Sequence, residues 1–74
     1  MSEHAYQIIG TIEALNKTSV VIFVTEIVRK STGETYEPDE EIVFARNLFD
    51  ADDLGEVGDD VDATVTSRLL AKYF

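Results

Sequence analysis

The sequence of 74 residues predicts one small, mainly β domain that closes, or nearly closes, into a five-stranded barrel over residues 1–74. Three observations support this class: segments rich in β-branched residues, turn-forming residues at short intervals, and only one brief helical signal. A chain of this length buries only roughly 60 % of its unfolded surface, so the core is thin. Closure is expected because an open sheet of five short strands leaves edges exposed.

The first two strands are predicted at residues 6–15 and 19–29, with a break at residues 16–18. Alternate residues of the first segment, beginning with Tyr6 and Ile8, fall on one face of an extended chain. The second segment is rich in valine and isoleucine. Its first half is apolar on both faces, which is typical of a covered central strand.

The second half of the chain is predicted to contain shorter strands separated by turns. Gly33 and Gly58 mark two turns, and Pro38-Asp39 interrupts the extended segment between them. A short strand is predicted at residues 41–46, and another begins at Val61 and is expected to run towards Phe74. Residues 69–74 are too apolar for a loose tail, so they are expected to pack as a strand, a helix or an interface.

A single helical turn is predicted at about residues 50–55. Asp50 is a suitable N-cap, and Asp53 occupies the third position after it. Phe49 before the cap is expected to meet Leu54 as a hydrophobic staple. Gly55 is expected to end the turn.

Charge is distributed unevenly along the chain. Twelve of the fifteen acids lie between Glu34 and Asp62 with one base, Arg46, so this segment carries −11 and the rest of the chain +2. Such a balance disfavours a basic nucleic-acid-binding surface, and it predicts one strongly negative side. Its cause is either adaptation to a high-salt (halophilic) cytoplasm or a basic protein partner. The residues predicted for protein interaction are Glu40, Glu41, Asp52, Asp53, Glu56, Tyr73 and Phe74.

No arrangement of residues predicts catalysis, a cofactor or a metal site. There is no cysteine, no phosphate-binding loop, and a single histidine, His4, near one end. The acidic run from Asp50 is similar in spacing to a calcium loop, but its fifth and twelfth positions are Leu54 and Val61 rather than ligands. With no signal peptide and no apolar run long enough to cross a membrane, we expect a cytoplasmic protein.

The segment Gly10-Thr11-Ile12-Glu13-Ala14-Leu15-Asn16 resembles the opening strand of cold-shock domains. The family's two RNA-binding motifs would fall on residues 19–24 and 42–46, and its late turn is similar to residues 58–61. The resemblance implies an OB-type barrel and single-stranded nucleic acid as a ligand.

The chain departs from that family at the positions that carry its aromatic rings. Cold-shock domains stack bases on exposed rings, and each stack contributes roughly 1–3 kcal/mol. Of the matching positions only Phe23 keeps a ring; the others are Ala14, Val21, Val43, Ala45 and Arg46. The residues left as candidates for nucleic-acid contact are Lys17, Phe23, Arg46 and Arg68.

Three functions remain as hypotheses. The first is a non-catalytic acidic module that binds a protein with a basic patch. The second is a single-stranded RNA-binding OB domain from a halophilic proteome. The third is a DNA mimic that inhibits a nucleic-acid enzyme. We rank protein interaction first because the stacking rings are missing.

Overall fold

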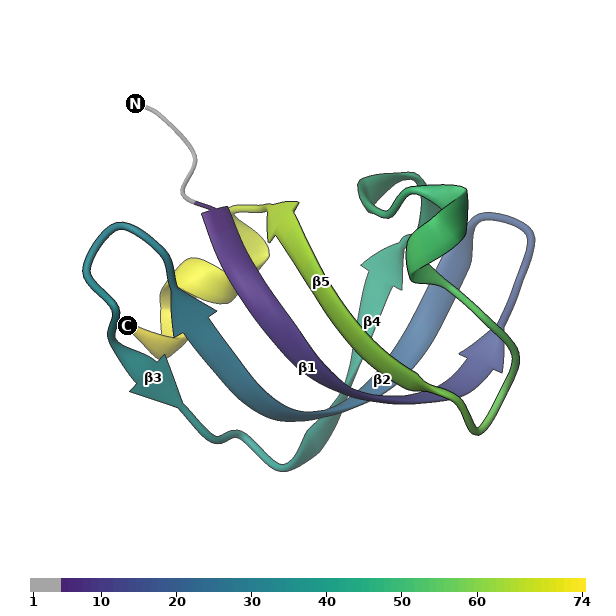
Figure 1. Ribbon diagram of the computed structural model, residues 1–74, viewed down its shortest axis with the longest axis horizontal. Coiled ribbons are helices and arrows are strands. Elements are labelled where there is room, and N and C mark those ends of the chain that lie inside the picture. Colours follow the sequence, from purple (N-terminus) through teal and green to yellow (C-terminus); the bar gives the residue numbers. More distant parts are fainter. Residues whose placement is uncertain (1–4) are drawn as a thin grey trace.

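A computed structural model describes residues 5–74, which form a five-stranded antiparallel sheet and three short 3-10 helices (Figure 1). The mainly β class is therefore confirmed; His4 lies outside the described residues. The elements in chain order are β1 (Ala5–Leu15), β2 (Ser19–Arg29), β3 (Thr35–Tyr36), β4 (Glu40–Ala45), η1 (Arg46–Leu48), η2 (Ala51–Asp53), β5 (Asp60–Thr66) and η3 (Leu69–Tyr73).

The expected closure into a barrel is wrong, because the sheet is open. The long hairpin of β1 and β2 forms its centre, β5 pairs with β1, and both β3 and β4 pair with β2. β5 lies along the first half of β1, whereas β4 lies along the first half of β2, at the other end of the hairpin. Because these two short strands lie at opposite ends, they are not paired with each other anywhere in residues 5–74.

Two register shifts bend the central hairpin (Figure 1). At the first, Ile9 pairs with Glu26 and Gly10 with Val24, so Thr25 is the extra residue. The Thr25 hydroxyl donates a hydrogen bond to the Ile9 carbonyl oxygen at 3.1 Å. A β-bulge bends its strand and increases the local twist. The hairpin therefore curves around the apolar side chains on its inner face.

The core lies inside this curve, and the alternation predicted for the first segment holds as far as Ile12. After the second register shift Ala14 lies on the outer face and Leu15 packs against the core. Along β1 and β2 buried and partly exposed residues alternate, and in β5 every second residue is buried. The Phe44 ring of β4 meets the Phe49 ring edge to face, with centroids 5.7 Å apart. Leu70 of η3 is fully buried, so the C-terminal segment packs against the same core.

The predicted helical turn is present as the 3-10 helix η2. The Asp50 backbone N–H donates to the Asp53 carboxylate at 3.2 Å, as expected for a capping box. Phe49 is buried in the core, and Leu54 packs against the same core. The strand predicted at residues 41–46 ends one residue early, because the chain turns at Arg46 into η1.

Candidate binding surface

The outer face of the sheet carries a row of small apolar side chains across three strands. Ala14 of β1 pairs with Val21 of β2, which in turn pairs with Val43 of β4. Residues paired in an antiparallel sheet point to the same face, so these three side chains are neighbours. Phe23 lies two residues along β2, also on this face. With Ala45 near the end of the row, they form a surface that we call the apolar patch: Ala14, Val21, Phe23, Val43 and Ala45.

The apolar patch is accessible and has an acidic border. Val43 is 60 % exposed, whereas Val21 and Phe23 are half-buried. The exposed residues Glu13 and Glu41 lie beside it, Glu41 as the cross-strand neighbour of Phe23. The patch brings Phe23 together with Ala14, Val21, Val43 and Ala45, none of which carries a ring. Small aliphatic side chains can be covered by another apolar surface, but they provide no face on which a base stacks.

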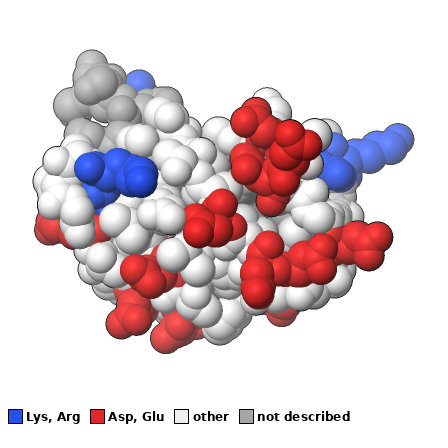
Figure 2. Space-filling model, in the orientation of Figure 1, with Lys and Arg blue, Asp and Glu red and all other residues white. Residues whose placement is uncertain are grey.

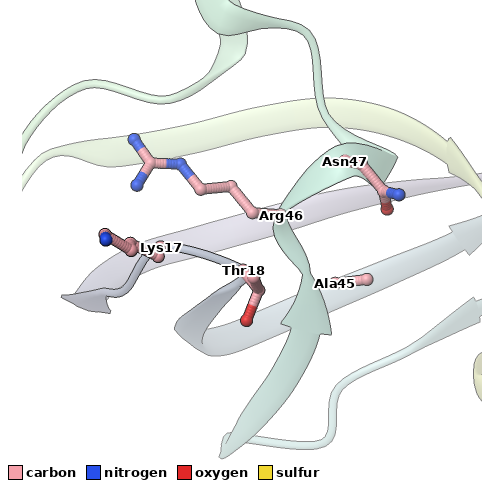
Figure 3. Close-up of a pocket in the computed structure, with 5 residues that line it drawn as sticks. All are labelled: Lys17, Thr18, Ala45, Arg46 and Asn47. Carbon is pink, nitrogen blue, oxygen red and sulfur yellow. The ribbon is translucent and has the colours of Figure 1, made fainter.

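A pocket of about 330 Å³ adjoins the apolar patch where the β1–β2 loop meets the end of β4 (Figure 3). Its lining consists of Lys17, Thr18, Ala45, Arg46 and Asn47. Figure 3 shows the Lys17 and Arg46 side chains extending to the same side of the β4 end. The pocket is therefore bordered by two cationic groups from segments almost thirty residues apart in the sequence.

The structure separates the residues predicted for nucleic-acid contact into two groups. Lys17 and Arg46 lie together at the pocket, and Phe23 lies on the neighbouring apolar patch. Arg68 is elsewhere: it follows Thr66, which pairs with Ala5 at the far end of β1. Arg46 and Arg68 therefore lie near opposite ends of the central hairpin.

The residues predicted for protein interaction through charge lie on different elements. Glu40 and Glu41 begin β4, Asp52 and Asp53 lie in η2, and Glu56 lies in the turn before β5. Figure 2 shows carboxylates spread over the face in view, including its left and right ends, where basic residues also lie. Some of the carboxylates form hydrogen bonds with the backbone. The Asp59 carboxylate, for example, accepts a hydrogen bond from the Glu56 backbone N–H at 2.9 Å.

The predicted residues Tyr73 and Phe74 pack against their own chain. The Tyr73 ring stacks on Tyr36 of β3 with centroids 5.1 Å apart, and the Phe74 ring stacks on Tyr6 at 5.7 Å. The Tyr73 hydroxyl donates to the Glu40 carboxylate at 2.5 Å. Burial, and then this hydrogen bond, raise the pKa of Tyr73 to about 12. Tyr73 and Phe74 therefore hold η3 against β1 and β3, although Phe74 keeps a 37 % exposed surface.

Most residues of the apolar patch stand out in the sequence only as positions without rings, and the sequence does not show that they form one surface. The signal was present in their alternation with buried residues, but the pairing between strands was needed to bring them together.

In the part of the chain that the structure describes, no group of three or more acidic or histidine side chains could hold a metal ion. None of the helices described there has the length and apolar character needed to cross a membrane. No family model, curated protein or solved structure matches the chain.

Proposed function

We propose that this chain is a non-catalytic module that binds a protein through the apolar patch and its acidic border. The partner presents an apolar segment to Val21, Phe23 and Val43, and basic side chains to the surrounding carboxylates. The proposed scaffold is an OB-like sheet, related in design to cold-shock domains, in which the ring-bearing face has become aliphatic. The aliphatic side chains of this face then contact a protein surface, whereas the rings of cold-shock domains stack on bases.

The observation that carries the proposal is the row formed by Ala14, Val21 and Val43 on the outer face. Its most exposed member, Val43, can be covered by a partner, and full burial of a valine side chain contributes roughly 1.5–3 kcal/mol. The carboxylates nearby contribute mainly to the rate of association and to the choice of partner. A protein with net charge −9 attracts basic surfaces over a distance of about 8 Å at physiological salt.

The test compares two valines of equal exposure. Val43 lies on the apolar patch and Val57 in the turn before β5, and each is 60 % exposed. We expect Val43→Asp to abolish co-purification of a stoichiometric protein from the native host, whereas Val57→Asp leaves it intact. Equal recovery of that protein with both variants would contradict the proposal. Circular dichroism of each variant checks that the fold is retained.

The same preparation distinguishes the RNA alternative. Titration with single-stranded oligonucleotides at two salt concentrations is expected to show no binding, because the patch has one ring. Binding at low salt that weakens as salt rises would favour RNA over a protein partner. If no protein is recovered and the free energy of unfolding rises steeply with salt concentration, adaptation to a saline cytoplasm explains the many acidic residues better than a protein partner does.

A further inference from the structure

The pocket beside β4 places two cations together in a chain that is otherwise strongly acidic. Fifteen acids outnumber six bases, yet the pocket lining contains Lys17 and Arg46 and no carboxylate. In the described residues 5–74 neither side chain forms an ion pair; the pair that is observed joins Arg29 to Glu34, at 3.6 Å. Two like charges in one place repel each other, and an anion between them would relieve this repulsion.

Hydrogen bonds to backbone carbonyl groups hold the Arg46 guanidinium in position beside the loop that carries Lys17. The Arg46 guanidinium donates through Nη1 to the Asn16 carbonyl oxygen at 2.7 Å. The Arg46 backbone N–H donates to the Thr18 carbonyl oxygen at 3.0 Å. These two bonds join the β1–β2 loop, which carries Lys17, to the end of β4. The guanidinium is thereby fixed beside the loop, while its other N–H groups remain to donate to a ligand.

We propose that the pocket bordered by Lys17 and Arg46 is a binding site for a small oxyanion, a phosphate or carboxylate group. Arg46 supplies planar N–H donors that match the spacing of two oxyanion oxygens, and Lys17 supplies a second, mobile charge. Thr18 and Asn47 add a hydroxyl and an amide to the lining. The site lies beside the apolar patch, but binding of a free anion does not depend on a protein partner.

A nucleic-acid strand is the less favoured source of the anion. Strand binding requires a basic groove and successive rings, and beside this pocket the chain offers Ala45 and Val43 instead. The surrounding carboxylates also repel a polyanion more strongly than a single anionic group. A single phosphate or carboxylate, in contrast, needs only the two cations of the pocket.

The test is a titration of the full chain, followed by ¹H–¹⁵N NMR, with sodium phosphate and separately with sodium acetate at constant ionic strength. We expect saturable shifts confined to the amides of residues 16–18 and 45–47. Tighter binding of phosphate identifies a phosphate ligand, and tighter binding of acetate a carboxylate ligand. Lys17→Gln is expected to weaken binding about fivefold, the effect of one charge near 4 Å in water.

Lys30→Gln is the matched control, because it removes the same charge from an exposed lysine at the other end of the central hairpin. We expect its affinity to stay within about twofold of wild type, since salt screens charges at that distance. Shifts that do not saturate, or equal weakening by both variants, would overturn the assignment. So would an oligonucleotide that binds more tightly than phosphate and shifts the amides of the whole apolar patch.

Discussion

Replacement of Gly10 by alanine tests how the central hairpin bends. Gly10 is buried at the first register shift, where β1 passes very close to β2. A β-carbon at this position would collide with the carbonyl oxygen of Phe23 and would lie 3.0 Å from Cγ2 of Ile22. Because the first of these atoms belongs to the backbone, no change of rotamer removes the clash, and the two strands must separate.

The expected cost is large relative to the stability of so small a domain. Overpacking of a well-packed core usually costs about 1–3 kcal/mol, and a clash with backbone lies at the upper end. A domain of this length has a free energy of unfolding of roughly 4–11 kcal/mol. We therefore expect Gly10→Ala to lose about 3 kcal/mol, which lowers the melting temperature by roughly 12–24 °C.

The measurement is urea denaturation followed by circular dichroism, with Gly33→Ala as the control. Gly33 has a φ of 77°, and a β-carbon at this position would lie in open space, so its replacement introduces backbone strain without a clash. We expect that control to lose only about 1 kcal/mol. A loss below 1 kcal/mol for Gly10→Ala, or a loss no greater than that of the control, would refute the close approach of the two strands.

Two further variants probe the core and the C-terminal contact. Phe44 is almost fully buried, so Phe44→Ala is expected to cost about 3–5 kcal/mol by calorimetry; a loss below 1 kcal/mol would contradict its place in the core. The pKa of Tyr73 is raised to about 12, above its unfolded value of 10.0, so the folded state favours the protonated phenol. The contribution of the Tyr73 hydroxyl to the free energy of unfolding is complete below pH 10 and is lost as pH rises towards about 12. Denaturation midpoints measured across this range should therefore fall more steeply in wild type than in Tyr73→Phe, and parallel curves would contradict the raised pKa of Tyr73.

The candidate site could be predicted from the sequence only in part. The sequence predicts Lys17, Phe23 and Arg46 as candidates, because cations and a ring at those positions are visible in the chain itself. Arg68 was grouped with them, although the pairing of Thr66 with Ala5 places it at the far end of the hairpin. Proximity between such residues depends on strand register, and the alternation of side chains does not reveal which strands are neighbours.

Four of the five strands and the short helical turn can be predicted from the sequence, because these elements depend on neighbours within a few residues. The two-residue strand β3 and the 3-10 helix η1 are not predicted. Alternation with period two selects strands, and the cap of η2 needs only Asp50 and Asp53. Tertiary structure decided that the sheet stays open, since β4 and β5 pair with opposite ends of the hairpin. It also joined Ala14, Val21 and Val43 into one patch, because cross-strand neighbours are fixed by long-range pairing.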